Sequence, residues 1–426
     1  MGHFAYESGR LLCNGVPVAD VAREHGTPAY VYSEAALREN VGALRDAFAE
    51  VDPLICYAMK ANDSLAVCKV LADEGCGCDI VSGGELFRAL KVGVDPGKIV
   101  YAGVGKTRAE IAYGLESGIL LFNVESEPEA ERISAVAGEL GTEARVALRV
   151  NPDVDPHTHQ HRVTGKKGTK FGVDLAVARE VAGRVRSLPH VRLVGLHMHL
   201  GSPVNAPEPY DEALGRMAEL LAACRADGAK IEWLDVGGGF GIEYQGGETA
   251  TPAEYARAIV PHVKRSGCRA ILEPGRRLVG NAAVLITQVQ YVKEAGGKRF
   301  VIVDAGMNDL IRPALYDAYH RIWPVKCGKP VPHGAAALEA ATDGRVRVDV
   351  VGPVCESGDF FARDRLLPPV SADELLVIFS AGAYTCSMSS NYNSRPRGCE
   401  VMISKGTSRV IRARETYEDL IAHERL

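Results

Sequence analysis

The sequence predicts an α/β protein made of a (β/α)8 barrel and a second, all-β domain. Two observations indicate the barrel. Eight short apolar segments, rich in β-branched residues, recur between residues 53 and 273, and stretches with helical periodicity separate them. Strands that alternate with helices favour a parallel sheet, and eight such units over about 250 residues have the size of a barrel. An open, doubly wound sheet is the alternative. The second domain is indicated by the residues after 276, where strands and turns follow one another without long helices.

The eight predicted barrel strands share an apolar centre and end at turn residues. They lie at 53–59, 78–81, 99–103, 120–124, 145–150, 192–198, 231–236 and 269–273. Three of the intervening segments, 64–75, 82–93 and 210–228, have an amphipathic helical pattern and end at glycine, as helices often do. These alternating units are expected to form a barrel domain over residues 27–276.

The predicted all-β domain covers residues 277–426. Its apolar strand segments are separated by Gly, Pro and Asn turns and lie at 282–306, 345–354, 375–384 and 399–405. The N-terminal segment 1–26 has the same pattern of short strand segments and turns, so we expect it to join this domain. The barrel would then be inserted between two parts of the β domain.

Composition excludes several classes of function. The chain has 46% hydrophobic and 24% charged residues and a formal net charge of −5, values typical of ordinary globular proteins. The most basic stretch, 165–170, is short and contains two glycines, so it does not indicate nucleic-acid binding. No apolar run reaches the roughly 18 residues that span a bilayer. The eleven cysteines are scattered without a secretory signal, which predicts reduced thiols in a cytoplasmic protein. Cys76 and Cys78 form a C-x-C pair without a second pair, so no metal site is expected.

Polar or glycine-rich residues follow six of the eight predicted strands. The carboxyl ends of barrel strands carry the active site in this fold, so these residues are expected to lie in one ring. They are Lys60, Asp79, Ser82, Glu85, Arg149, His199, Ser202, Gly237, Gly238, Gly239, Glu273, Gly275 and Arg276.

The glycine-rich turn at residues 237–241 indicates a phosphate site. The dinucleotide-binding pattern G-x-G-x-x-G fails here, because Ile242 stands where its last glycine would be. Three glycines after a strand instead allow backbone N–H groups to approach a single phosphate. Ser202 and Arg276 would add a hydroxyl and a guanidinium to the same anion.

The remaining groups in this ring fit the other parts of one cofactor. Lys60 can condense with an aldehyde, His199 can stack on an aromatic ring, and Glu273 can pair with a ring nitrogen. A phosphate, an aldehyde and a pyridine nitrogen together describe pyridoxal 5′-phosphate (PLP). The sequence therefore predicts a PLP site in the barrel.

Six motifs in order along the chain carry a family resemblance. They are YAMKAN (57–62), HMHLGS (197–202), GGGFG (237–241), EPGR (273–276), GPVCESGD (352–359) and GAYTCSMSSNYNSRPRGCEV (382–401). With these motifs the chain resembles the barrel-type, fold type III PLP-dependent decarboxylases, and in detail the diaminopimelate decarboxylase family. The resemblance implies an alanine racemase-like fold and decarboxylation of meso-2,6-diaminopimelate to L-lysine and carbon dioxide. It also implies a homodimer whose active sites are each completed by a segment of the partner subunit.

The resemblance assigns further roles residue by residue. Cys355 would supply, in the partner's site, the proton that replaces carbon dioxide, and Glu356 would bind the ammonium at the substrate's distal centre. Arg276, Arg312 and Tyr316 would hold the distal carboxylate. Tyr384 would reach phosphate and substrate, Arg149 would lie near the ring hydroxyl, and Asp79 and Glu85 would lie behind the cofactor.

The resemblance also implies a lid at 153–170. In this chain the lid contains His157, His159 and His161, whose alternation leaves a metal site conceivable.

Three alternatives remain open at this point. A relative could decarboxylate carboxynorspermidine or a D-amino acid; Arg312 and Glu356 disfavour ornithine and arginine. Alanine racemase shares the fold, but its chemistry would leave the Cys355 loop unexplained. A catalytically inactive binding protein would be expected to have lost Lys60 or Cys355, and both are present.

Overall fold

The computed structural model describes residues 2–155, 170–245, 249–328 and 344–426. The chain divides into two compact units. The first, called the barrel unit here, comprises Glu39–Ile242 and Thr249–Leu278. The second, called the sheet unit, comprises Met1–Arg38, Glu243–Glu248 and Val279–Leu426. The predicted domain boundaries at residues 26 and 276 stay a prediction.

The barrel predicted from the sequence is confirmed. Eight parallel strands pair in the order β5-β6-β7-β8-β9-β11-β12-β13, and β13 pairs with β5, which closes the ring. The strands are β5 (Leu54–Ala58), β6 (Gly77–Ile80), β7 (Ile99–Tyr101), β8 (Leu121–Val124), β9 (Ala144–Asn151), β11 (Val191–His197), β12 (Trp233–Asp235) and β13 (Arg269–Leu272). A short strand, β10 (Val173–Asp174), pairs with β9 outside the ring. An open doubly wound sheet is thereby excluded.

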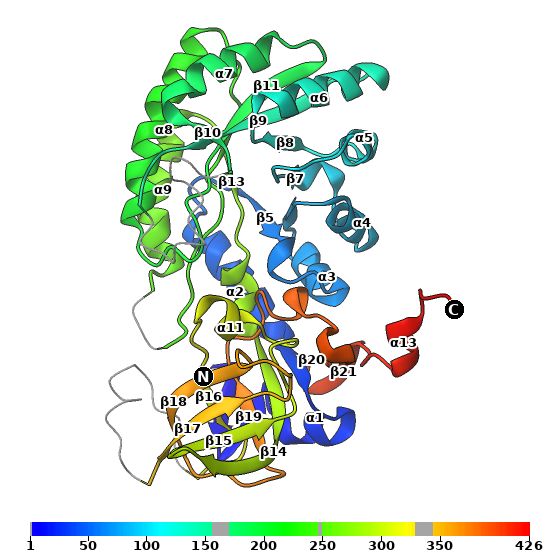
Figure 1. Ribbon diagram of the computed structural model, residues 1–426. Helices are drawn as coiled ribbons and strands as arrows, with labels where there is room; N and C mark the ends of the chain where they lie inside the picture. The colour runs from blue at the N-terminus through cyan, green and yellow to red at the C-terminus, as the bar shows by residue number, and fades with distance from the viewer. Residues whose placement is uncertain (1, 156–169, 246–248, 329–343) are drawn as a thin grey trace. The chain divides into compact units, whose positions relative to one another are not determined.

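Helices surround these strands (Figure 1). They are α2 (Glu34–Ala47), α3 (Leu65–Asp73), α4 (Gly83–Lys91), α5 (Arg108–Ser117), α6 (Glu127–Glu139), α7 (Leu175–Ser187), α8 (Glu208–Ala226), α9 (Pro252–Ser266) and α10 (Arg276–Val279). Local sequence explains where several begin and end. Thr107 and Glu110 form a capping box at the start of α5, and Gly118 ends that helix in the left-handed conformation.

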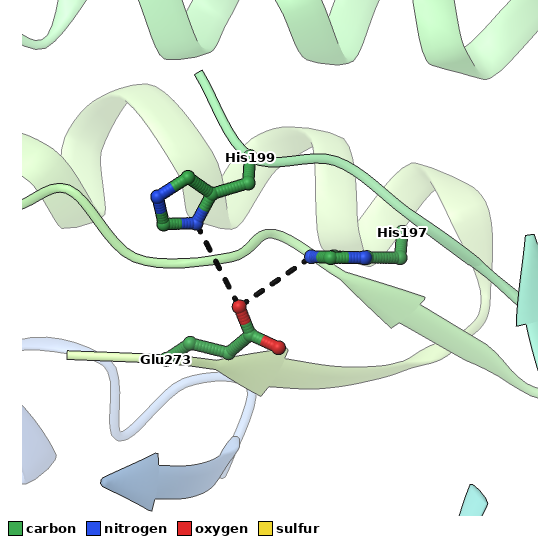
Figure 2. Close-up of side chains that lie close together, drawn as sticks. All are labelled: His197, His199 and Glu273. Carbon is green, nitrogen blue, oxygen red and sulfur yellow. Dashed lines mark ion pairs between the residues drawn. The ribbon is translucent and has the colours of Figure 1, made fainter. Parts of the chain in front are cut away.

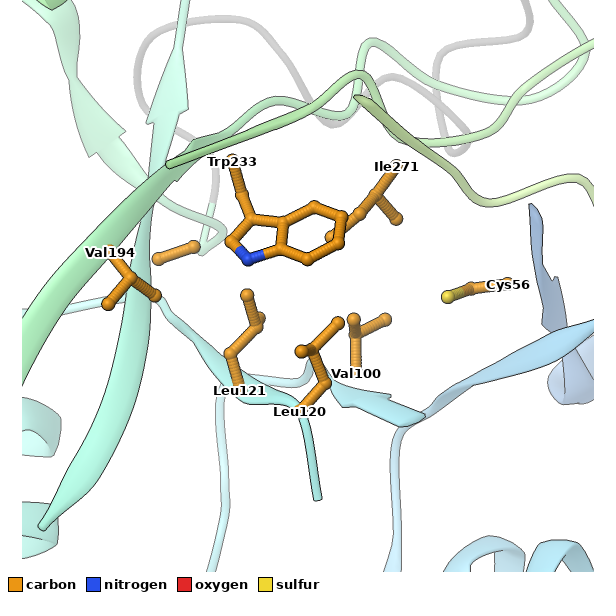
Figure 3. Packing of buried hydrophobic residues seen from close by; sticks show 8 residues of the cluster. Cys56, Val100, Leu120, Leu121, Val194, Trp233 and Ile271 are labelled. Atoms are coloured by element: carbon orange, nitrogen blue, oxygen red, sulfur yellow. The ribbon is translucent and has the colours of Figure 1, made fainter. Parts of the chain in front are cut away.

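The barrel interior is apolar on the side nearer the amino ends of the strands. Side chains from seven strands or their first flanking residues meet there and exclude water (Figure 3). The cluster consists of Cys56, Val100, Leu120, Leu121, Ala147, Val194, Trp233 and Ile271. It forms a packed layer, as expected for a barrel of this size.

The polar residues of the site form the next layer of the same interior. Successive side chains of a strand alternate between its two faces, so residues two apart point the same way. Four positions of the apolar cluster are followed two residues later by a buried polar side chain. The pairs are Leu121 and Asn123, Ala147 and Arg149, Trp233 and Asp235, and Ile271 and Glu273. The strand period therefore places these polar groups together above the apolar layer, toward the carboxyl ends of the strands.

The sheet unit is built mainly of strands, as predicted. Its largest sheet has the order β18-β17-β15-β14-β4-β20-β21, and β16 and β19 extend it beside β14. A separate three-stranded sheet contains β1, β2 and β3. The strands are β1 (Phe4–Glu7), β2 (Arg10–Cys13), β3 (Val16–Pro17), β4 (Ala29–Ser33), β14 (Ala283–Ala295), β15 (Lys298–Val303), β16 (Ile322–Pro324), β17 (Val346–Val351), β18 (Phe360–Leu367), β19 (Leu375–Ile378), β20 (Cys399–Ser404) and β21 (Thr407–Arg412).

Strand β4 joins the N-terminal segment to this sheet, because it pairs with β14 and β20. Short helices complete the unit: α1 (Val18–His25), α11 (Arg312–Tyr316) and α13 (Tyr417–Ile421). Within the described residues, no helix has the length and apolar character that crossing a membrane requires.

Candidate active site

A cavity of about 430 Å³ lies where the barrel strands end. Its lining includes four of the residues predicted from the sequence, Lys60, Arg149, His199 and Glu273. The volume is in the range of small-molecule sites, and a few charged groups converge in it, as in such sites generally. The structure thus brings these four residues together.

Lys60 is held by a buried acid. Its Nζ donates to Oδ2 of Asp79 at 2.5 Å, and the Asp79 side chain is fully buried while that of Lys60 is one-third exposed. Burial and, to a smaller extent, the charge of Glu273 raise the pKa of Asp79 to about 7, although Lys60 acts in the opposite direction. The second oxygen of Asp79 is buried and lacks a hydrogen-bond partner among the described residues. Asp79 thereby fixes the position of the Lys60 amine.

Glu273 lies at the centre of the polar layer. Its Oε2 is 3.4 Å from Nε2 of His197 and 3.7 Å from Nδ1 of His199, and all three residues point toward one another in Figure 2. Burial acts to raise the pKa of Glu273, but the charge and hydrogen bond of His197 outweigh it and hold the pKa well below its usual value. Burial lowers the pKa of His199 to about 4. Near neutral pH the site therefore presents an ionised carboxylate beside a neutral imidazole.

A second acid lies next to Glu273. Nδ2 of Asn123 bridges the two carboxyl groups, 3.1 Å from Oε1 of Glu273 and 3.0 Å from Oδ2 of Asp235. Burial, followed by the charge of Glu273, raises the pKa of Asp235 well above its usual value. Two buried acids this close do not both ionise readily, so Asp235 holds the proton and Glu273 the charge.

Arg149 is oriented from behind by Glu125. Its Nη1 donates to Glu125 Oε1 at 2.7 Å, and both side chains are buried. The guanidinium also lies over the ring of Phe171, 4.8 Å from its centroid. The other oxygen of Glu125 accepts the N–H of Gly172 at 2.8 Å. The arginine head is therefore fixed at the wall of the cavity.

The glycine turn is required by backbone packing. A Cβ at Gly237, Gly238 or Gly239 would come within 2.2, 2.0 and 2.3 Å of the carbonyl oxygens of Met198, Glu273 and Gly201. Gly237 and Gly239 also have positive φ values, of 73° and 102°. Only glycine lets the three strand ends approach this closely.

The turn differs in one respect from the expectation of exposed N–H groups. The turn is buried, and two of its N–H groups have partners inside the protein: that of Gly237 donates to Asp235, and that of Gly238 donates to Nδ1 of His199. These two bonds couple the glycine turn to the residues around Glu273, a link that the glycine pattern alone does not reveal.

The remaining predicted residues of the barrel unit lie outside the lining of this cavity. Arg276 is buried, and its Nε and Nη2 lie 3.4 and 3.3 Å from Oγ of Ser202. Gly275 lies against Ala58 and Ala61, with 3.1 Å from its ideal Cβ to each methyl group. Glu85 accepts the N–H of Val81 at 2.6 Å.

Cys355 and Glu356 lie in the sheet unit, in the loop that follows β17. Both are exposed. The loop is nevertheless ordered by Asp359, which is buried and accepts the N–H groups of Met307 and Val354, each at 2.7 Å. Glu356 accepts the hydroxyl of Tyr392 at 2.6 Å. A buried acid therefore fixes the backbone while the cysteine and its neighbour face outward.

The sheet unit also carries Arg312, Tyr316 and Tyr384. Arg312 and Tyr316 begin and end α11, with Arg312 buried and Tyr316 half-buried. Tyr384 is half-buried and has a positive φ of 57°, an uncommon conformation for a bulky side chain. His157, His159 and His161 lie outside the described residues, as does most of the predicted lid at 153–170.

The sequence alone did not single out four buried polar residues that support the site: Asn123, Glu125, His197 and Asp235. Each interrupts or ends an apolar strand segment with a polar residue, which was the available signal. His197 alternates with His199, and Asp235 lies two residues before the first glycine of the turn. Their pairing across the barrel interior depends on the register of neighbouring strands, which one sequence does not contain.

Comparison with known proteins identifies the family. Residues 34–280 match the family model for the pyridoxal-dependent decarboxylase, pyridoxal binding domain. The chain is 44% identical to a diaminopimelate decarboxylase of Aquifex aeolicus over 98% of this chain and 96% of that protein. It is 46% identical to one of Neisseria meningitidis serogroup A over 97% and 98%.

Solved structures agree with this result. The structure of diaminopimelate decarboxylase from Helicobacter pylori complexed with L-lysine matches with a TM-score of 0.88 and 39% identity, over 95% of this chain and 98% of that one. An M. jannaschii diaminopimelate decarboxylase in co-complex with L-lysine matches with a TM-score of 0.91 and 37% identity, over 100% and 99%. The chain belongs to the diaminopimelate decarboxylase family of pyridoxal-dependent decarboxylases.

Proposed function

We propose that this chain catalyses the PLP-dependent decarboxylation of meso-2,6-diaminopimelate to L-lysine and carbon dioxide, the last step of lysine biosynthesis. The observation that carries the proposal is the cavity in which Lys60, Arg149, His199 and Glu273 converge, in a chain of this family. The relatives support the decarboxylation of diaminopimelate over carboxynorspermidine or D-amino acids as the reaction.

The donor set of the cavity fits PLP. Lys60 would bind the aldehyde, with Asp79 behind it, and Arg149 would lie near the ring hydroxyl. The buried, unpartnered oxygen of Asp79 is a polar atom of the kind a bound group satisfies. Ser202, Gly239, Gly275, Arg276 and Tyr384 would hold the phosphate. Gly237 and Gly238, whose N–H groups donate within the protein, would contribute to the cofactor site by letting the backbone approach closely. When bound, PLP supplies an electron-accepting ring for the electron pair that remains after carbon dioxide leaves.

The protein's own groups set the charge of the site. Ionised Glu273 would hold a proton on the ring nitrogen and so keep the ring electron-poor. His199, neutral because its pKa is about 4, would cover the ring face without adding a competing positive charge. Asn123 donates to both Glu273 and Asp235 and so holds the two carboxyl groups together.

The substrate's two ends need different partners. Arg276, Arg312 and Tyr316 would hold the distal carboxylate, and Tyr384 would contact substrate as well as phosphate. Glu356 would bind the distal ammonium. A guanidinium fork matches a carboxylate in two parallel hydrogen bonds, so these residues would also decide which of the two similar centres faces Lys60. Cys355 would donate the proton that replaces carbon dioxide.

We further propose a homodimer in which the loop with Cys355 and Glu356 completes the site of the partner subunit. The exposure of both residues on an ordered loop supports this arrangement. We also infer a cytoplasmic location. All eleven cysteines are free thiols, as expected in a reducing compartment.

The test is product release from purified protein with added PLP. The panel contains meso-, LL- and DD-diaminopimelate, L- and D-ornithine, L- and D-lysine, L-arginine and carboxynorspermidine. We expect turnover of the meso isomer alone, with L-lysine and carbon dioxide in equal amounts. Turnover of another member instead would overturn the substrate assignment. Absorbance of lysine-bound cofactor without any turnover would overturn the assignment as a decarboxylase and favour a binding protein.

A further inference from the structure

Arg312, which we propose to bind the distal carboxylate, is part of a buried cluster within the sheet unit whose other members have no assigned role. The arginine side chain is 2% exposed, and its Nη1 lies 2.7 Å from Nε2 of His320. Its guanidinium carbon lies over the ring of Tyr244, 4.7 Å from the centroid. The ring of Tyr244 in turn meets that of His320 edge-on, at 5.5 Å and 80°. Arg312, His320 and Tyr244 therefore contact one another in all three pairs.

The hydrogen bonds of His320 determine its tautomer. Nδ1 lies 2.9 Å from the carbonyl oxygen of Phe379, which can only accept, so Nδ1 carries the hydrogen. A guanidinium can only donate, so Nε2 must present its lone pair to Arg312. Protonation of Nε2 would place two N–H groups against each other. His320 is thus a neutral acceptor that fixes one arm of the arginine fork.

The backbone around His320 is held as well. Nη1 of Arg365, on β18, donates to the carbonyl oxygen of His320 at 2.8 Å. The N–H of Phe379 donates to the carbonyl oxygen of Arg321 at 2.9 Å. The histidine is fully buried. Its acceptor nitrogen is therefore presented from a rigid frame, which is what an orienting residue needs.

We propose that His320 is a positioning residue: it locks the guanidinium of Arg312 in the orientation that receives the carboxylate retained in the product. This inference rests on the proposed function and deepens it. Decarboxylation at one centre of diaminopimelate leaves the carboxylate of the other centre in lysine, so substrate and product share the group that Arg312 would bind. Cadaverine, the diamine of the same chain length, lacks it. Lysine and cadaverine together therefore isolate the carboxylate contact.

The test compares His320→Gln with His320→Asn in the PLP-loaded enzyme. The Gln amide oxygen reaches the place of Nε2 and can still accept from Arg312, whereas the Asn amide reaches only the place of Nδ1 and can still donate to Phe379. We expect H320N to raise the KM for meso-diaminopimelate and the Kd for L-lysine about tenfold, as for loss of one charged hydrogen bond. We expect kcat and the Kd for cadaverine to stay unchanged. In H320Q all values should stay within about threefold of wild type.

Tyr244→Leu gives a second variant that removes the half-buried ring from the guanidinium and leaves the histidine in place. It should show the same selective loss of lysine affinity, about threefold. Equal losses in H320N and H320Q, or equal losses for lysine and cadaverine, would overturn the positioning role, and so would unchanged lysine affinity in both H320N and Y244L. Titration calorimetry reads lysine and cadaverine binding without turnover. Failure of wild type to decarboxylate meso-diaminopimelate would count against the proposed function alone.

Discussion

The barrel site and the loop at 352–359 differ in how their functional groups are supported. In the barrel unit, each proposed catalytic group is supported by contacts within the unit: Asp79 holds Lys60, and Asn123 and two histidines surround Glu273. In the sheet unit, Asp359 fixes the loop backbone while Cys355 stays exposed. Lys60 and Glu273 are thus held by contacts within their own unit, whereas the loop presents the exposed thiol of Cys355. In the homodimer that we propose, this exposed group would serve the barrel site of the partner subunit.

Replacing Lys60 should have the largest effect. Without its amine the cofactor has no covalent attachment, so K60A should lower kcat more than about a thousandfold. The absorbance of lysine-bound cofactor should also disappear. K91A, which removes an exposed lysine at the end of α4, should retain wild-type activity and absorbance. Substantial activity in K60A would contradict the role of Lys60.

Replacing Cys355 should affect the reaction but not the fold. Loss of a proton donor typically lowers the rate about 10²- to 10⁴-fold, so C355A should lower kcat in that range with little change in KM. Its Tm should equal that of wild type because the side chain is exposed. Cys327→Ala, in the same unit, should leave kcat unchanged. Equal kcat values in C355A and wild type would remove Cys355 from the mechanism.

Replacing Asp359 separates the loop's position from its chemistry. D359N weakens the charged hydrogen bonds to Met307 and Val354 but leaves Cys355 present. Misplacement of the loop should lower kcat about ten- to a hundredfold, less than removal of the thiol. The measurement compares the kcat of D359N with the kcat of C355A. A larger loss in D359N than in C355A would show that Asp359 has a role beyond holding the loop.

Asp79 should also make the free energy of unfolding depend on pH. The pKa of Asp79 is about 7 in the folded protein, above its value of 3.8 in the unfolded chain. Between about pH 4 and pH 7 the folded state therefore holds a proton that the unfolded state has lost, so the free energy of unfolding falls as pH rises. Each pKa unit corresponds to about 1.4 kcal/mol, which makes an effect on the order of a few kcal/mol.

D79N should weaken this pH dependence, since an amide does not titrate. Denaturant unfolding of the cofactor-free protein at pH 5 and pH 8 measures it. The stability difference between the two pH values should be smaller in D79N than in wild type. The same difference in both proteins would mean that Asp79 does not carry the proton.

The barrel and several residues of the candidate site could be predicted from the sequence. Strand and helix periodicity predicted the barrel, and residues at strand ends such as Lys60 and Glu273 could be picked out because the fold gathers those ends. The partners of these residues were missed. Asn123 reaches Asp235 and Glu273 across the barrel interior, and this contact depends on strand register rather than on local pattern. His320 was missed because its role depends on the carbonyl group of Phe379, 59 residues away.

The most direct test of the central claim mixes two strongly impaired variants, K60A and C355A, and allows their subunits to exchange. If the Cys355 loop completes a partner's barrel site, each mixed dimer contains one site with both Lys60 and Cys355. The account predicts that the mixture decarboxylates meso-diaminopimelate much faster than either parent alone. A mixture no faster than its parents, with mixed dimers demonstrated by differential tagging, would contradict it.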